Sequence, residues 1–204
     1  MRSTPDWKRR AWHLRWRTAP RLASAARIRV ARLTHGHTRI VIPDSVFAGR
    51  GFRLEIPGAG SLIVGERVQF RQGFYCEIDG EGELTIGAGT IFTGDAMIQC
   101  TTRISIGERC MFGQATFLAD GAHLFRDWTK HLVDQGYNYR PLTIEDNAVV
   151  HTKSTVVANV GYRAVVAANS FVNRDVPAYT LVGGVPATVL EYFGPPAEEP
   201  AARP

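Results

Sequence analysis

The chain has 204 residues, with 24 Lys or Arg, 19 Asp or Glu and a formal net charge of +5 at pH 7. This length suits one domain, or one domain with an extension, and is enough to enclose a core. No apolar run approaches the roughly 18 residues that span a membrane, and no apolar segment of a secretory signal follows the basic N-terminus. We therefore expect a cytoplasmic protein, with the inner membrane surface as the alternative location.

Positive charge is concentrated at the N-terminus. Residues 2–32 contain ten Lys or Arg against one acid, Asp6, whereas residues 33–204 contain 14 basic and 18 acidic residues. A basic segment of this kind can attract nucleic acid or an anionic membrane. Because no nucleic-acid-binding motif accompanies the charge, we expect no nucleic-acid partner.

The basic segment also has helical character. Trp12 and Trp16 are four residues apart, which is helical spacing, and Pro20 separates them from a second apolar and basic stretch. We predict that residues 1–36 form a basic amphipathic helical arm. Two interpretations of residues 7–33 remain open. They contact an anionic membrane surface, or they pack on the rest of the chain or on a neighbouring subunit.

Beyond the arm, aliphatic or aromatic residues recur in six-residue steps. The clearest runs are Ile86, Phe92 and Ile98; Ile106, Phe112 and Leu118; Ile144, Val150 and Val156; and Val160, Val166 and Val172. Each hexad is one short strand with a corner, and three hexads make one triangular coil. A single coil cannot bury its apolar side, so coils must stack. The repeat predicts an all-β solenoid, a parallel β-helix, over residues 37–190.

Two segments depart from the repeat. Between Leu118 and Ile144 the hexads stop, which predicts a protruding loop over residues 119–142. After the solenoid, residues 191–204 are rich in proline, alanine and glutamate and are expected to form a flexible tail.

The three cysteines, Cys76, Cys100 and Cys110, are scattered, and their spacing does not indicate a zinc site. Buried free cysteines are usually inert packing residues, so we expect these three to behave as small hydrophobic side chains. A catalytic cysteine is the alternative.

The segment Asp175–Ala187 reads Asp-Val-Pro-Ala-Tyr-Thr-Leu-Val-Gly-Gly-Val-Pro-Ala. It resembles the C-terminal signature of hexapeptide-repeat acyltransferases, and the resemblance extends over residues 62–190. The similar subgroup is that of the maltose, galactoside and surface-polysaccharide O-acetyltransferases. The resemblance implies a left-handed coil, acetyl-CoA as co-substrate without a permanently bound cofactor or metal, and a homotrimer with active sites between subunits. It also implies acetyl transfer to a hydroxyl of a sugar or glycan-like acceptor.

Such a reaction needs a base beside the acceptor hydroxyl, and histidine is the side chain whose ordinary pKa lies near neutrality. His123 lies seventeen residues after Ile106, where the family places its catalytic histidine at the start of the loop. The resemblance therefore implies that His123 takes the acceptor proton. The oxygen then attacks the thioester directly, and a backbone N–H holds the oxyanion. The alternative for a loop histidine is a solvated side chain.

Further site residues follow from the same resemblance. Lys153 and Arg174 are candidates to bind the phosphates of CoA, although exposed charges on polar corners are the alternative. Asp95 lies eleven residues before Ile106, where related enzymes carry an acceptor-binding polar residue.

The sequence also departs from the family pattern. Val149 and His151 stand where the family usually has tryptophan and glycine, which implies a changed acceptor pocket. Two other functions stay open, and the loss of the tryptophan and glycine favours the second of them. One is a zinc-dependent γ-type carbonic anhydrase, which needs three converging histidines, but the close histidine pair is missing. The other is a catalytically degenerate β-helix that serves as a scaffold or trimeric binding module.

Overall fold

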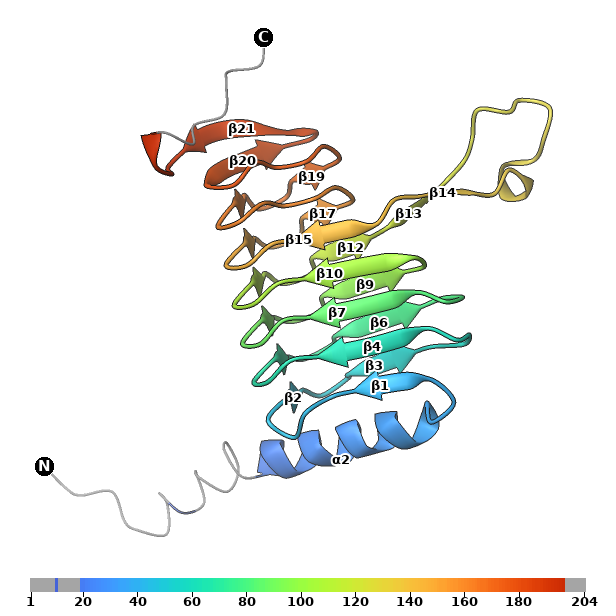
Figure 1. Cartoon of the computed structure of the whole chain (residues 1–204), viewed down its shortest axis with the longest axis vertical. Helices are drawn as coiled ribbons and strands as arrows, with labels where there is room; N and C mark the ends of the chain where they lie inside the picture. The colour runs from blue at the N-terminus through green and yellow to red at the C-terminus, as the bar shows by residue number, and fades with distance from the viewer. Residues whose placement is uncertain (1–9, 11–18, 197–204) are drawn as a thin grey trace, which may run out of the picture.

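The computed structural model describes residue 10 and residues 19–196. The predicted helical stretch around Trp12 and Trp16 and the end of the predicted tail lie outside these residues. The described chain runs from one helix, α2 (Ala19–Thr34), into a tall stack of short strands from which a single long loop projects (Figure 1). No helix in this described part is long and apolar enough to cross a membrane.

The strands wind into a three-sided prism, because successive strands from β1 to β12 and from β15 to β17 fall in three sheets in turn. The first sheet consists of β1 (Arg39–Val41), β4 (Ser61–Val64), β7 (Glu83–Ile86), β10 (Arg103–Ile106) and β15 (Leu142–Ile144). The second consists of β2 (Phe47–Ala48), β5 (Gln69–Phe70), β8 (Ile91–Phe92), β11 (Met111–Phe112), β16 (Val149–Val150), β18 (Val165–Val166), β20 (Thr180–Gly184) and β21 (Ala187–Tyr192). The third consists of β3 (Arg53–Glu55), β6 (Tyr75–Ile78), β9 (Met97–Cys100), β12 (Phe117–Ala119), β17 (Thr155–Val156) and β19 (Phe171–Val172).

Register confirms the hexad repeat. From β1 to β20, each strand of the prism pairs in parallel with the strand one coil away, so Phe70, Phe92 and Phe112 stand directly above one another in the second sheet. All three rings are fully buried, and consecutive ring centres are 5.5 and 4.6 Å apart. Inward residues of neighbouring coils therefore pack on one another and form the continuous core that a single coil lacks.

All irregular steps of the repeat fall on one edge of the prism, where the chain passes from the third sheet to the first. Ile98 and Ile106 are eight residues apart across this edge, and Val156 and Val160 only four. The long loop leaves the prism at the same edge, between β12 and β15. We call it the loop edge.

The two ends of the stack are closed in different ways. Helix α2 lies across the N-terminal end and buries Ile28 and Ala31 against the first coil. The Ser24 hydroxyl, also buried, accepts a 2.7 Å hydrogen bond from the backbone N–H of Ala48 at the end of β2. At the other end, β21 folds back antiparallel on β20.

Candidate active site

The loop begins as a short antiparallel ribbon. Strand β13 (Gly121–His123) pairs with β14 (Tyr137–Tyr139), so Gly121 faces Tyr139 and His123 faces Tyr137. A Cβ atom on Gly121 would lie 2.7 Å from the Tyr139 ring, closer than real Cβ contacts allow. Glycine at this position therefore lets the two strands approach. A 3₁₀ turn, η2 (Leu132–Asp134), lies in the outer part of the loop.

Asp120 fastens the first end of the loop to the coil below. Its side chain is only 3% exposed, and its carboxylate accepts four hydrogen bonds from the turn after β9. The donors are the backbone N–H groups of Thr101 (2.8 Å), Thr102 (2.7 Å) and Arg103 (2.8 Å), and the Thr102 hydroxyl (2.9 Å). Hydrogen bonds to an ionised acceptor are the stronger kind, so this carboxylate fixes where the loop starts.

Arg140 fastens the other end. Its backbone N–H donates a 2.7 Å hydrogen bond to the carbonyl oxygen of Asp120, which ties the two ends of the loop together. Its guanidinium contacts both carboxylate oxygens of Asp175 at 2.7 Å. Asp175 in turn accepts a 3.0 Å hydrogen bond from the backbone N–H of Asn159. The loop is thus attached to the coils on both sides of it.

His123 stands on this anchored ribbon with its side chain exposed. Its ring centre lies 4.2 Å from that of Tyr137, and the Tyr137 ring stacks on Tyr139 at 5.5 Å. The described residues provide no hydrogen bond to either imidazole nitrogen, so both nitrogens are open to a substrate. Desolvation and the neighbouring Tyr137, Asp79 and Asp120 raise the pKa of Tyr139. A tyrosine hydroxyl can donate a hydrogen bond to a substrate.

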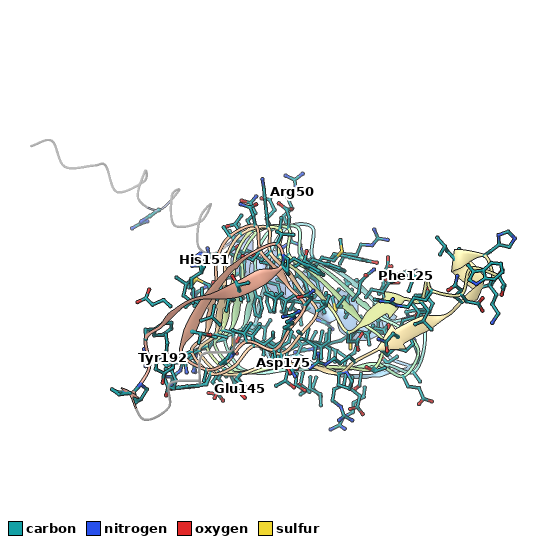
Figure 2. All side chains as sticks on the ribbon, turned by 90° about the horizontal axis from the view of Figure 1, so that it is seen from above. Arg50, Phe125, Glu145, His151, Asp175 and Tyr192 are labelled. Atoms are coloured by element: carbon teal, nitrogen blue, oxygen red, sulfur yellow. The ribbon has the colours of Figure 1, made fainter. Side chains whose placement is uncertain are left out.

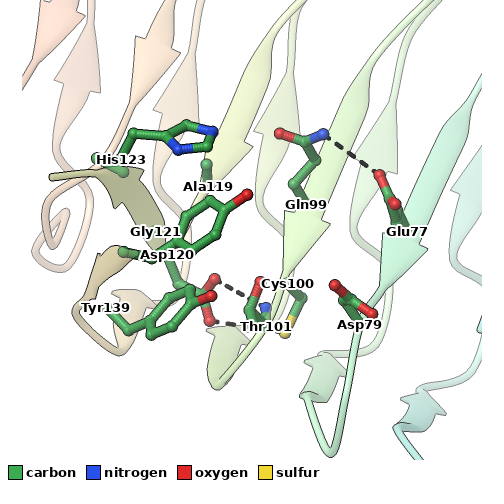
Figure 3. Close-up of a pocket in the computed structure, with 12 residues that line it drawn as sticks. Glu77, Asp79, Gln99, Cys100, Thr101, Ala119, Asp120, Gly121, His123 and Tyr139 are labelled. Atoms are coloured by element: carbon green, nitrogen blue, oxygen red, sulfur yellow. Dashed lines mark hydrogen bonds between the residues drawn. The ribbon is translucent and has the colours of Figure 1, made fainter. Parts of the chain in front are cut away.

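A pocket of about 280 Å³ lies between this ribbon and the third sheet (Figure 3). His123, Tyr137 and Tyr139 line it from the loop side. Glu77, Asp79 and Gln99 line it from the coils below, and the Gln99 amide donates a 3.3 Å hydrogen bond to Glu77. The pocket thus combines one base with several groups that can accept hydrogen bonds from hydroxyls.

Two of these lining residues, Glu77 and Gln99, belong to a register that the predictions from the sequence missed. Glu55, Glu77 and Gln99 occupy equivalent positions on β3, β6 and β9 and stand in one row on the outer face of the third sheet. Each is 22 residues from the next. That equal spacing, combined with an outward-pointing position of the hexad, was the signal that could have revealed them.

Of the four residues singled out from the sequence, His123 alone lines the pocket. Asp95 lies exposed at the corner between β8 and β9, where its carboxylate accepts a 3.4 Å hydrogen bond from Gln114. Lys153 lies at the equivalent corner between β16 and β17. Arg174 lies on the loop edge, after β19. Within one chain, the two predicted phosphate-binding cations are therefore on different edges of the prism.

His151 is exposed two residues before Lys153, at the corner between the second and third sheets. It is therefore on a different edge from the pocket that His123 lines. The backbone at this corner is crowded, because a Cβ atom on Gly113 of the coil below would lie 2.4 Å from the Thr152 nitrogen. The imidazole of His151 thus projects from a tight corner into solvent.

The cysteines behave as the sequence analysis predicts. All three are buried and free. Burial raises the pKa of Cys100 to about 12 and that of Cys110 to about 11, and it raises the pKa of Cys76 well above its ordinary value. Neutral buried thiols are poor nucleophiles. Among the described residues, no three His, Cys, Asp or Glu side chains are grouped so that they could hold a metal ion.

Comparison with known proteins places this geometry in a family. No family model matches the chain. A hexapeptide-repeat-containing acetyltransferase from Vibrio cholerae, solved with acetyl coenzyme A, is 30% identical over 64% of this chain and 70% of its own, with a TM-score of 0.58. Another structure of the V. cholerae acetyltransferase matches 84% of this chain and 82% of its own at 28% identity, with a TM-score of 0.52.

Galactoside acetyltransferase in complex with coenzyme A is 21% identical over 65% of each chain, with a TM-score of 0.56, and so shares the fold. The parallel three-sheet prism, the loop at one edge and the 30% identity to the V. cholerae acetyltransferase lead to one assignment. The chain belongs to the hexapeptide-repeat acyltransferases, and its solenoid is a left-handed parallel β-helix.

Proposed function

We propose that this protein transfers an acetyl group from acetyl-CoA to a hydroxyl of a sugar or glycan-like acceptor, with His123 as the general base. Family membership supports acyl transfer, and the V. cholerae relative, which was solved with acetyl coenzyme A, supports acetyl-CoA as the co-substrate. The observation that carries the proposal is the position of His123 at the rim of a polar pocket beside the loop edge.

The reaction requires one proton transfer to His123 and one proton transfer from it. As the acceptor oxygen attacks the thioester carbon, a ring nitrogen of His123 takes the hydroxyl proton. A backbone N–H stabilises the negative charge on the thioester oxygen. The new ester bond forms, the C–S bond breaks, and the imidazolium returns its proton to the departing CoA thiolate. No acyl-enzyme is needed, which agrees with the burial of all three cysteines.

The lining of the pocket supports a polyhydroxylated acceptor. Glu77, Asp79 and Gln99 each offer an oxygen that can accept a hydrogen bond from a hydroxyl. The partly exposed ring of Tyr137 adds an apolar surface beside them. A sugar ring has hydroxyls on its rim and apolar C–H faces, so it matches both features.

Assembly would complete the site. We propose a homotrimer because the loop carries large apolar side chains away from its own prism, including Phe125 (Figure 2) and Trp128, which is 93% exposed. Such surface is normally covered by another subunit. In a trimer, Lys153 of one chain and Arg174 of its neighbour would together bind the CoA phosphates. Asp95 is on another edge from His123, so it would reach an acceptor beside His123 only across a subunit boundary. Light scattering tests the trimer, and a monomer mass at micromolar concentration contradicts it.

The test of the function is free-thiol release from acetyl-CoA in the presence of a panel of sugars. His123→Ala is expected to lower the rate by roughly two to four orders of magnitude, the usual contribution of a positioned general base. Titration calorimetry should show little change in CoA affinity, because the imidazole acts on the acceptor. His131→Ala is the matched control, since His131 is exposed in the same loop but does not line the pocket.

Two outcomes would reject the proposal. If His123→Ala turns over like the wild type, the base is elsewhere, and a dead His151→Gly variant would point to the other edge of the prism. If the wild type releases no thiol with any acceptor and binds no CoA, the degenerate scaffold is the better interpretation.

A further inference from the structure

The outward face of α2 carries an apolar stripe that nothing in the described chain covers. The helix packs on the first coil through Ser24, Ile28 and Ala31, which are four and three residues apart and share one face. On the opposite face, Leu22, Val30 and Leu33 are 67%, 57% and 74% exposed. With Ala26 between them, the stripe follows steps of four, four and three residues, which is one continuous helical face.

Positive charge borders this stripe. Arg29 is three residues after Ala26 and four before Leu33, so it lies beside the stripe. Arg27, on the other flank, donates a 3.1 Å hydrogen bond to the carbonyl oxygen of Ala48 and is directed toward the prism. Arg21 and Arg29 form no ion pair with any described residue, whereas Arg32 is paired with Asp44. Residues 7–43 contain no Asp or Glu at all. The N-terminal end of the molecule is therefore both apolar and cationic.

The position of α2 leaves this face accessible. The helix lies across the end of the prism (Figure 1). Its stripe is on the face opposite the buried Ser24, Ile28 and Ala31, so it is directed away from the stack. Subunits that pack side by side along the prism would cover sheets and edges but not this end. The stripe therefore needs a partner other than the neighbouring subunits of a side-by-side assembly.

We infer that the outward face of α2 binds an anionic lipid surface and holds the N-terminal end of the prism against a membrane. Leucine and valine side chains enter the acyl boundary, while the exposed Arg21 and Arg29 meet lipid phosphates, as in other interfacial helices. A second copy of the chain is a poorer occupant, because pairing this face with itself would bring like charges together. The inference is independent of the acyl-transfer reaction and of the identity of its acceptor.

The experiment is flotation of the full-length chain with vesicles of phosphatidylcholine alone and of phosphatidylcholine mixed with phosphatidylglycerol. We expect binding to the mixed vesicles and its loss at high salt, because screening weakens the electrostatic part. The variant Val30→Glu with Leu33→Glu should bind the mixed vesicles at least about tenfold more weakly. The control is Val189→Glu with Leu190→Glu, which adds the same charges to side chains 56% and 60% exposed at the other end of the stack.

The control pair should bind like the wild type, and both pairs should keep the wild-type melting curve. The inference is overturned if the wild type does not float with the mixed vesicles. It is also overturned if the α2 pair binds like the wild type, since residues 1–18 would then carry the binding, or if both pairs lose binding equally. Absence of vesicle binding together with a lower oligomer mass in the α2 pair would instead identify a second copy as the occupant.

Discussion

Replacing Asp120 by asparagine should loosen the attachment of the loop and slow the reaction that we assign to His123, three residues later. The substitution keeps the shape of the side chain and removes its charge. In the structure, one carboxylate oxygen accepts three hydrogen bonds from N–H and O–H donors, the backbone N–H groups of Thr102 and Arg103 and the Thr102 hydroxyl. The Cys100 thiol adds a longer and weaker contact of 3.9 Å to the same oxygen. The other oxygen accepts one, from the backbone N–H of Thr101. Asparagine can supply only one of these two acceptors.

The expected loss of stability follows from the hydrogen bonds that asparagine would weaken or lose. With the amide oxygen in the position that accepts three bonds, the amide NH₂ faces the Thr101 N–H, and leaving a buried donor unsatisfied costs about 1–3 kcal/mol. The other three bonds lose their charge assistance, at about 0.5 kcal/mol each. The sum is about 2.5–4.5 kcal/mol, which corresponds to a decrease in Tm of roughly 5–18 °C for a chain of this size.

Two measurements check this prediction. Scanning calorimetry gives the change in Tm, and thiol release from acetyl-CoA should show a lower kcat with little change in CoA affinity, because Asp120 positions the loop without touching the donor. Asp134→Asn is the control, since Asp134 is exposed in the same loop and none of the described residues forms an ion pair with it. If Asp120→Asn melts and turns over like the wild type, the carboxylate does not anchor the loop.

Two further predictions concern the core. Phe92→Ala should lower the free energy of unfolding by about 3–5 kcal/mol, because the ring is fully buried between Phe70 and Phe112; urea denaturation measures it, and a cost below that of Phe92→Leu would contradict the stacked core. The three thiols should resist iodoacetamide in the native protein and react in denaturant, as mass spectrometry would show. Burial raises the pKa values of the three thiols in the folded state. Above the ordinary thiol pKa of about 8.5, these thiols should therefore ionise in unfolded chains but not in folded ones, so the native state should lose stability as the pH rises. Rapid native labelling of any one cysteine, or unchanged stability at alkaline pH, would refute this.

The sequence determined the prism because the repeat is local. A hexad places one apolar residue inward and pairs with the hexad one coil away, so Phe92, Phe112 and Val150 can be assigned to one sheet by counting. The same counting also shows on which edge of the prism a corner residue lies. Lys153 is three residues after Val150 of the second sheet, and Arg174 is two residues after Val172 of the third, so their separation onto two edges could have been deduced from the sequence.

The contacts that build the site could not be deduced in this way. Asp120 acts on a turn that is 17 to 19 residues earlier in the chain. Arg140 reaches Asp175, which is 35 residues later. Both contacts depend on the path of the loop backbone at its two ends. The loop has no repeat from which this path could be predicted. Tyr137 likewise meets His123 only because β13 and β14 form a ribbon inside a segment without apolar repeat.

The loop edge explains why the proposed site lies where it does. Within a sheet, an inserted residue would shift every later side chain to the opposite face and remove an apolar residue from the core. At the loop edge the step between inward residues ranges from four, between Val156 and Val160, to 26, between Leu118 and Ile144, while every other step stays at six. This edge therefore tolerates change in length without disturbing the register. A solenoid of this kind can acquire a ribbon that carries a histidine only where its repeat is allowed to vary, and His123 stands on the largest of these insertions.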